Sequence, residues 1–322
     1  MDKVKVGVVG VGHLGRFHTL NYTKIQEVEL VGVTDIDQEK ARRVASEGQC
    51  EAFENIESLF DRVDAVSIVV PTNHHFDIGK RALERGKHCL IEKPITKSVI
   101  EAEELILLAK NKGVTLQVGH VERFNPAIRV LEGMQIKPRF IESHRLAPFN
   151  PRGTEVAVVL DLMIHDIDII LSLVKSPVKS VDASGVAVVS NSIDIANARI
   201  CFENGCVANL TASRISQKKM RKMRLFQKDT YITVDFLERN SEIYQLIEGE
   251  GEYDNILGEI GVGERRRRIV YQRPEVPEEG GLLTELETFI RTVKGGNPPA
   301  VSGEEGKAAL VVAFQVLQEM EG

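Results

Sequence analysis

Three polar side chains in one segment have the types and the spacing for proton transfer. In DLMIHDID, Asp161, His165 and Asp168 stand at i, i+4 and i+7, so they share one face of the helix predicted over Asp161–Val174. An imidazole titrates near neutral pH, so His165 is suited to remove a proton from an alcohol, and a carboxylate one turn away could orient it. The residues alone fit equally well a satisfied histidine near a domain interface, with Asp161 as a helix cap.

A glycine-rich turn near the N-terminus has the spacing of a dinucleotide-binding site. Gly10-Val-Gly12-His-Leu-Gly15 follows a strand-like run and opens a helical segment. In this context Gly10 makes the tight turn, Gly12 admits the pyrophosphate and Gly15 allows close helix packing, while the helix N-terminus attracts the anion. The expected cofactor contacts in this turn are Gly10, Gly12, His13, Leu14 and Gly15. The alternative is a glycine-rich turn without a ligand.

An acidic residue about 20 positions on completes the pattern. Asp35 ends the next predicted strand, where its carboxylate can bind two ribose hydroxyls. The same charge would repel a 2′-phosphate, and no basic residue follows directly, so we expect NAD rather than NADP as the cofactor. A helix N-cap is the alternative for Asp35.

The tripeptide Glu92-Lys93-Pro94 ends a strand predicted over residues 88–94. In open parallel sheets, ligands bind beyond the carboxyl ends of the strands, so a charged pair there indicates a binding cleft. The alternative is a surface salt bridge between Lys93 and Glu92. Neighbouring side chains on an extended chain point in opposite directions, which disfavours that alternative.

A second polar segment follows the strand predicted over residues 65–71. We expect cofactor contacts from its residues Pro71, Thr72, Asn73 and His75. A plain helix start is the alternative for His75. No cluster of His, Cys and carboxylate residues has metal-ligand spacing, and His74 and His75 are adjacent, so no metal site is predicted.

Residues 1–121 alternate short β-branched runs with amphipathic segments, which predicts βαβ units and a doubly wound parallel sheet of the Rossmann type. The expected strands are 4–10, 28–35, 65–71, 88–94 and 114–120, and the expected helices are 15–24, 37–47, 75–85 and 98–112. These elements place the glycine turn, Asp35 and Lys93 at the carboxyl ends of neighbouring strands.

Residues 122–322 have a different pattern, which predicts an α+β domain on a mostly antiparallel, open-faced sheet. Apolar and polar residues alternate at 207–215 and 230–237, as in strands with one wet face. Two C-terminal helices are expected at 282–293 and 302–319, and they could pack back on the first domain. The glycine-rich, acidic stretch 249–264 is expected to be a mobile loop, and whether it acts as a lid is left open.

Length and composition limit the function classes. A chain of 322 residues is expected to form two domains, because single cores rarely exceed about 250 residues. The net charge of −6 argues against nucleic acid as a partner. The four cysteines have no C-x-x-C pairing and lie in apolar or strand-like stretches, which predicts buried free thiols. Without a signal-peptide layout or a long apolar run, the protein is expected in the cytoplasm and not in a membrane.

The order of these motifs resembles that of the Gfo/Idh/MocA oxidoreductases. The matching segments are Gly10–Gly15, Asp35, Pro71–His75, Glu92-Lys93-Pro94, Arg123-Phe124-x-Pro126, Asp161-x-x-x-His165-x-x-Asp168, and the C-terminal Glu285, Phe289 and Gly295–Gly303. The resemblance implies a Rossmann domain for residues 1–121. It also implies a substrate-binding and oligomerisation domain for 122–322, whose sheet builds a homodimer or homotetramer.

The resemblance also implies residue roles in a dehydrogenase that passes a hydride from a CH–OH group to the nicotinamide. Lys93 would hold the reacting hydroxyl and contact the cofactor ribose, with Glu92 beside the cofactor. His165 would be the general base, and Asp161 would hydrogen-bond the substrate or His165. The implied substrate contacts also include Arg123 and Asn125. Asp168 is interpreted as structural.

Two segments, 118–127 and 161–168, are most similar to a subgroup acting on nucleotide-linked amino sugars, which implies oxidation of the 3-hydroxyl of UDP-N-acetylglucosamine. The segment before the Asp/His helix has Gly153 alone where the family has several glycines, so a different pocket wall is expected. A free sugar or an inositol is the alternative substrate, and a non-catalytic dinucleotide sensor is the alternative function. Arg265–Arg268 is interpreted as a solvated or subunit-contacting face rather than a substrate-phosphate site.

Overall fold

The computed structural model describes residues 3–150, 156–248, 255–262 and 266–321. Its contacts divide the chain into two compact units. The first contains Met1–Phe124 and Glu279–Val311, and the second contains Asn125–Glu278 and Val312–Gly322. Helix α9, Gly303–Glu321, therefore contributes residues to both units. The sequence prediction assigned 122–322 to a second domain and left open that C-terminal helices pack on the first.

The first unit is built on a six-stranded sheet with the order β3-β2-β1-β4-β5-β6. All its neighbouring strands are parallel, which confirms the predicted doubly wound fold. The strands are β1 Val4–Val9, β2 Val28–Thr34, β3 Glu51–Ala52, β4 Ala65–Ile68, β5 His88–Glu92 and β6 Leu116–Gly119. The strand order reverses between β1 and β4, and ligands of such sheets bind outside that point at the carboxyl ends.

The helices and 3₁₀ turns of the first unit are α1 His13–Tyr22, α2 Gln38–Gly48, α3 Ile56–Phe60, η1 Thr72–His74, α4 His75–Glu84, α5 Val99–Lys112, η2 Val121–Phe124 and α8 Gly281–Gly295. Local sequence explains where several of them begin. Asp37, Asn55 and Ser98 each precede a helix and accept a hydrogen bond from the backbone N–H three residues on. Helix α5 ends at Gly113, whose φ of +67° is the left-handed conformation that closes many helices.

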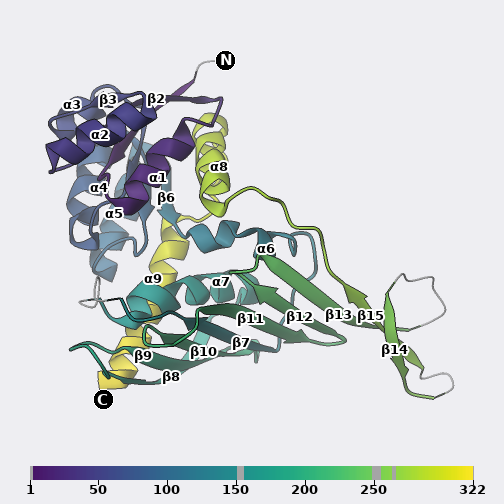
Figure 1. Cartoon of the computed structure of the whole chain (residues 1–322). Coiled ribbons are helices and arrows are strands. Elements are labelled where there is room, and N and C mark those ends of the chain that lie inside the picture. Colours follow the sequence, from purple (N-terminus) through teal and green to yellow (C-terminus); the bar gives the residue numbers. More distant parts are fainter. Residues whose placement is uncertain (1–2, 151–155, 249–254, 263–265, 322) are drawn as a thin grey trace. The chain divides into compact units, whose positions relative to one another are not determined.

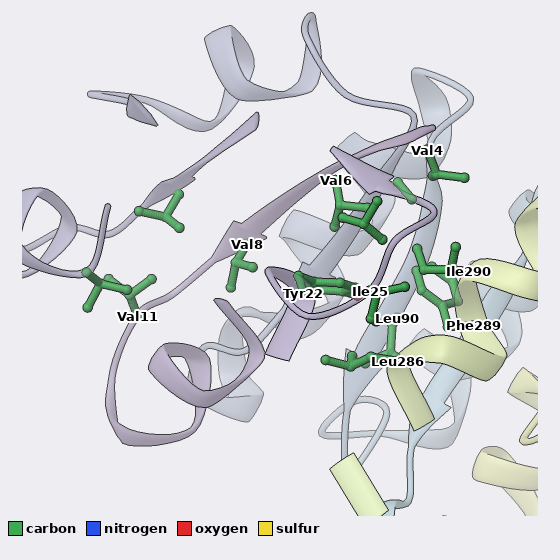
Figure 2. Close-up of a cluster of buried hydrophobic side chains, with 14 of the residues drawn as sticks. Val4, Val6, Val8, Val11, Tyr22, Ile25, Leu90, Leu286, Phe289 and Ile290 are labelled. Atoms are coloured by element: carbon green, nitrogen blue, oxygen red, sulfur yellow. The ribbon is translucent and has the colours of Figure 1, made fainter. Parts of the chain in front are cut away.

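Helix α8 packs into the core of the first unit, although it lies far along the chain (Figure 2). Leu286, Phe289 and Ile290 stand at i, i+3 and i+4, so they share one face. They are buried in one cluster with Val6 of β1 and Tyr22 of α1. Burial of such side chains contributes roughly 1.5–3 kcal/mol each to folding.

The second unit is built on a nine-stranded sheet with the order β14-β15-β13-β12-β11-β7-β10-β9-β8. Among its described pairs only β10 with β7 is parallel, so the predicted mostly antiparallel sheet is confirmed. The strands are β7 Phe140–Leu146, β8 Val178–Val186, β9 Ile195–Phe202, β10 Val207–Ser213, β11 Met220–Gln227, β12 Thr230–Asp235, β13 Asn240–Glu248, β14 Ile256–Ile260 and β15 Arg267–Gln272. Helix α6, Pro126–Arg129, also belongs to this unit.

The expected alternation is present along these strands but stops at their ends, where Ser213 and Asp235 are buried. Ala208, Leu210 and Ala212 are buried, while Asn209 and Thr211 between them are half-buried. Helix α7, Ile164–Val174, lies on one face of the sheet and is preceded by a turn of π-helix, η3, at Val159–Met163 (Figure 1). Side chains of α7 such as Ile167 and Ile170 are fully buried.

Three sequence expectations need correction. The predicted helix over 161–174 begins earlier, at residue 159. Its first turn is a π-helix, in which hydrogen bonds join residues i and i+5 rather than i and i+4. The expected loop at 249–264 contains strand β14, which pairs with β15; residues 249–254 and 263–264 lie outside the described residues. All four cysteines are free, as expected, but only Cys89 and Cys206 are buried. Cys50 and Cys201 are half-buried, so the expectation of four buried thiols is wrong for these two.

Within the described part of the chain, no helix combines the length and the apolar character needed to cross a membrane.

Candidate functional site

The glycine turn of the first unit has the geometry of an anion-binding loop. Gly10 adopts φ +86°, a conformation that side chains other than glycine rarely adopt. A Cβ on Gly12 would meet nothing within 4 Å, so open space lies above it, whereas a Cβ on Gly15 would overlap the Gly10 carbonyl oxygen. The first turn of α1 carries no acidic side chain, and its N–H groups have no partner within the helix. These features fit the pyrophosphate of a dinucleotide.

Asp35 lies at the end of β2 beside this turn. Its half-buried carboxylate accepts hydrogen bonds from the backbone N–H of Val11 at 2.7 Å and of Asp37 at 2.9 Å. The helix-cap alternative for Asp35 is wrong, because the N-cap of α2 is Asp37, which accepts from the N–H of Lys40. Each carboxylate oxygen can accept more than one hydrogen bond, so Asp35 still has capacity for ribose hydroxyls.

The other residues expected at the cofactor differ in exposure. His13 and Leu14 are exposed at the start of α1, and the His13 ring meets that of Phe17 edge-on at 5.0 Å. Pro71 precedes turn η1, which contains Thr72 and Asn73. Their contacts with a cofactor stay a prediction.

His75 is the first residue of α4 and is 1% exposed. Its Nδ1 lies 2.9 Å from the carbonyl oxygen of Pro94, and its Nε2 lies 2.8 Å from that of Val70. Burial lowers the pKa of His75, and the two carbonyl groups oppose this effect. Both ring nitrogens thus face carbonyl oxygens of this unit, and because a neutral imidazole has one N–H, one of the two contacts is a donated hydrogen bond.

Lys93 follows directly after β5 and is half-buried. Glu92 is 6% exposed, so its carboxylate lies in the interior of the unit and not at the surface. Its Oε1 lies 3.1 Å from Nε2 of His18, and its Oε2 accepts a hydrogen bond from the backbone N–H of Lys93 at 3.3 Å. Sequence reasoning missed His18, although it stands one turn after Gly15 on the helix that the glycine turn opens.

Asp161 and His165 lie in the second unit. Asp161 is the third residue of turn η3 and its backbone N–H donates to Ala157 O, so the helix-cap alternative is wrong for it. Both side chains are half-buried, whereas Asp168 is 1% exposed. The burial of Asp168 fits a structural role.

A buried ion pair fixes the helix that carries His165. Arg145 of β7 contacts Asp166 of α7 through two hydrogen bonds, from Nε at 2.8 Å and from Nη2 at 3.0 Å, and both residues are almost fully buried. Such bidentate pairing restricts the orientation of the two side chains as well as the distance between them. Sequence reasoning missed this pair. The signal was an arginine at an inward position of an alternating strand.

The expected substrate contacts Arg123 and Asn125 have structural partners. Nη1 of Arg123 lies 3.1 Å from Oε1 of Glu305, within the first unit. Asn125 caps α6 by accepting from the N–H of Ala127, and its amide donates to Phe236 O. Substrate binding by Arg123 and Asn125 stays a prediction.

The arginine run is held by acidic partners. Arg266 and Arg268 both pair with Glu259 of β14, and Arg267 pairs with Asp229 at 2.6 Å. Arg265 lies outside the described residues. These ion pairs fit a solvated face. Among all the residues that the structure describes, no group of three or more His, Cys, Asp or Glu residues could hold a metal ion.

Two family models match the chain. The model described as an oxidoreductase family with an NAD-binding Rossmann fold matches residues 4–120, and the GFO/IDH/MocA C-terminal domain model matches residues 137–233. Together they span both the parallel sheet and the first part of the antiparallel sheet.

Several known proteins are similar to this chain over its full length. A UDP-N-acetylglucosamine 3-dehydrogenase from Acidithiobacillus ferrooxidans is 39% identical over 322 residues, which cover 100% of this chain and 98% of that relative. A solved structure of the enzyme of that name has a TM-score of 0.90 and 40% identity, and covers 100% of this chain and 98% of its own. A myo-inositol 2-dehydrogenase from Thermotoga maritima is 26% identical over 337 residues, with 99% and 96% coverage.

Proposed function

Because the chain belongs to the Gfo/Idh/MocA family and is an NAD(P)-dependent oxidoreductase, we propose that it oxidises a ring hydroxyl of a sugar nucleotide. The proposed substrate is UDP-N-acetylglucosamine, oxidised at its 3-hydroxyl. One observation carries this proposal: the full-length similarity, in sequence and in structure, to the Acidithiobacillus enzyme of that activity.

The cofactor would be held by the first unit. The glycine turn and the N-terminus of α1 would bind the pyrophosphate, and Asp35 would bind the ribose hydroxyls of NAD. Since a 2′-phosphate would lie beside the Asp35 carboxylate, NAD is the proposed cofactor rather than NADP. When bound, the dinucleotide supplies the two-electron acceptor for alcohol oxidation.

The chain's own side chains would orient the substrate and move its proton. Lys93 would donate a hydrogen bond to the reacting hydroxyl and the cofactor ribose, and His165 would take the hydroxyl proton. Asp161 would hydrogen-bond the substrate or His165. A half-buried imidazole and a half-buried ammonium are accessible enough for such contacts.

Substitution of the proposed base and lysine tests these roles. We expect His165→Gln and Lys93→Met each to lower kcat by ~10²–10⁴-fold, because proton transfer and hydroxyl orientation are lost. The matched control is Lys97→Met, at an exposed lysine near Lys93 that pairs with Glu101. Wild-type kcat in either of the first two variants would contradict the mechanism.

The substrate is tested by following NADH formation with purified protein, NAD and a panel of sugar nucleotides, free sugars and inositols. A coupled aminotransferase that consumes the keto sugar is included, because an unfavourable equilibrium can hide turnover. We expect turnover with UDP-N-acetylglucosamine. Turnover restricted to inositols would instead favour the second candidate function, which the full-length similarity to the Thermotoga inositol dehydrogenase supports.

A dinucleotide sensor without turnover is the remaining alternative. It predicts NAD binding with no NADH formation on any member of the panel. The presence of Lys93, Asp161 and His165 together argues against it, since binding alone needs none of the three.

We also propose self-association through the nine-stranded sheet. One face of the sheet carries a continuous row of half-buried aromatic rings with centroid separations of 4.9–5.6 Å. The row consists of Phe140, Phe226, Tyr231, Tyr244 and Tyr271. Aromatic side chains in this number are typical of interfaces, so a homodimer or homotetramer is proposed.

The free cysteines support a reducing compartment, and the cytoplasm is the proposed location.

A further inference from the structure

We propose that two buried histidines, His18 and His75, hold the backbone around Lys93 in place and act as positioning residues for this lysine. The inference rests on the role proposed for Lys93 in the preceding subsection. All the groups involved belong to the first unit.

The first contact reaches Lys93 from helix α1. His18 is fully buried, and its Nε2 lies 3.1 Å from Oε1 of Glu92. A carboxylate only accepts hydrogen bonds, so Nε2 carries the proton. The other oxygen of the same carboxylate, Oε2, accepts from the backbone N–H of Lys93 at 3.3 Å. Glu92 therefore connects the helix that follows the glycine turn to the main chain of Lys93.

The end of strand β6 restricts where this carboxylate can lie. A Cβ on Gly119 would stand 2.8 Å from Oε1 and 3.1 Å from Cα of Glu92. Residue 119 is thus a glycine at a point where the Glu92 side chain and backbone come close. The carboxylate is confined between Gly119 and His18.

The second contact reaches the other side of Lys93 from helix α4. Nδ1 of His75 lies 2.9 Å from the carbonyl oxygen of Pro94, and Nε2 lies 2.8 Å from that of Val70. The ring therefore lies between the segment that follows β4 and the segment that follows β5, donating a hydrogen bond to one of the two carbonyl groups and packing against the other. It is 1% exposed, so water does not compete for either contact.

Together these contacts fix the main chain on both sides of one residue. The N–H of Lys93 is held by the Glu92 carboxylate, and the carbonyl group of the following residue, Pro94, faces His75. A lysine side chain has a long flexible stem, so its ammonium group is placed accurately only if its backbone is held. A shift of ~1 Å at a substrate-positioning group can cost about 10²-fold in rate.

The first test compares variants of His18. We expect His18→Leu, which removes the donor to Glu92, to lower kcat by ~10–10²-fold with the dissociation constant for NADH changed less than ~3-fold. His18→Gln places an amide N–H near the position of Nε2, so we expect it to restore kcat to within ~5-fold of wild type. His88→Leu is the matched control: His88 stands at the opposite end of β5, where it accepts from the N–H of Thr115. Its kcat should stay unchanged.

The second test separates the two contacts of His75. An asparagine amide reaches the position of Nδ1, whereas a glutamine amide reaches that of Nε2. We therefore expect His75→Asn to keep the contact to Pro94 and more of kcat than His75→Gln, which keeps only the contact to Val70. The reverse order would overturn this part of the proposal.

Structures of the variants provide a readout that does not depend on the substrate. In crystal structures we expect Lys93 to move by about 1 Å or more in His18→Leu and to stay in place in His18→Gln. Gly119→Ala, which displaces Glu92 without touching His18, should move Lys93 as well. If His18→Leu does not fold, Gly119→Ala carries the test.

The two proposals can fail separately. A wild-type protein that oxidises none of the panel substrates contradicts the proposed function, and the crystal structures then still decide whether the histidines hold Lys93. An unmoved Lys93 in both His18→Leu and Gly119→Ala overturns the positioning role. Equal loss of kcat in His18→Leu and His18→Gln also overturns it, because a merely structural role would not distinguish them.

Discussion

Asp35 is the residue on which we propose that the preference for NAD over NADP depends. Its carboxylate is held by two backbone N–H groups beside the glycine turn. We expect Asp35→Asn to weaken NADH binding and strengthen NADPH binding, changing the ratio of their dissociation constants by ~10–100-fold, because a charged hydrogen bond and a repulsive charge are both removed. Fluorescence titration with both reduced cofactors measures this ratio.

The neighbouring aspartate provides the control for that experiment. Asp37 caps α2 through the N–H of Lys40, and asparagine is an equally good cap, so Asp37→Asn should leave the ratio unchanged. An unchanged ratio in Asp35→Asn would mean that Asp35 does not contact the ribose.

Asp194 is the residue that organises the connection between β8 and β9. One of its oxygens accepts from the N–H groups of Val188, Val189 and Ser190, and the other accepts from the Ser190 hydroxyl. Burial alone would raise the pKa of Asp194, but these hydrogen bonds hold it well below its usual value. We expect Asp194→Asn to lower the free energy of unfolding by about 1–3 kcal/mol at pH 7.

The pH dependence of this effect has a defined sign. A carboxyl group whose pKa is lowered by folding stabilises the protein fully above its unfolded-state pKa, about 4, and this contribution is lost as the pH falls through the folded-state value. Urea unfolding should therefore give a constant difference between wild type and Asp194→Asn from about pH 8 to 5, and a smaller one below about pH 4. Asp182→Asn, at an exposed site of β8, is the control. A difference independent of pH would contradict the assignment.

At the scale of elements, the turn between β1 and α1 contains two glycines with different proposed roles: Gly12 leaves space for the cofactor, and Gly15 allows the helix to pack. Nothing lies within 4 Å of a Cβ on Gly12, and the φ of this residue is −62°, so Gly12→Ala should change stability by less than ~0.5 kcal/mol. The added methyl group would occupy the space for the pyrophosphate, so we expect the NADH dissociation constant to rise by at least ~10-fold.

Gly15→Ala is the contrasting variant in the same turn. Its Cβ would overlap the Gly10 carbonyl oxygen, so the helix must move, and we expect a loss of about 1–3 kcal/mol in unfolding free energy. Urea denaturation and NADH titration of both variants measure the contrast. Equal stability of the two would contradict the packing role of Gly15.

The element that carries His165 begins with a π-helical turn, and Asp161 lies in that turn. Such turns are frequent at functional sites, because they change the direction of one or two side chains within a helix. Helix α7 itself is fixed to the sheet by Arg145 and Asp166.

At the scale of the whole molecule, the aromatic row on the nine-stranded sheet is the surface that self-association would use. Tyr231 stands in the middle of it, stacked between Phe226 and Tyr244. We expect Tyr231→Glu to raise the dissociation constant of the oligomer by at least ~100-fold, because it places a charge in an apolar interface. Sedimentation velocity over a range of concentrations measures this change.

A charge introduced elsewhere controls for that variant. Asn111 is exposed at the end of α5 in the first unit, so Asn111→Glu should not change the sedimentation of the protein. A wild-type protein that sediments as a monomer at every concentration would contradict the oligomer proposal.

The sequence by itself determined the parallel sheet, the glycine turn and the alternating strands of the second unit. These features depend on local periods and on single backbone conformations, such as the positive φ of Gly10. A period of two or of 3.6 residues and a glycine at a fixed position can be recognised without knowing which segments meet.

Only the tertiary structure decided which distant segments form pairs. The contacts of Glu92 with His18, of Arg145 with Asp166, and of α8 with the core of the first unit join residues far apart in the chain. A buried polar side chain takes the partner that folding brings to it, and desolvation makes that partner obligatory. No local pattern encodes the partner's identity, so the two polar pairs could be found only in the folded chain, and the packing of α8 that the sequence left open was decided there as well.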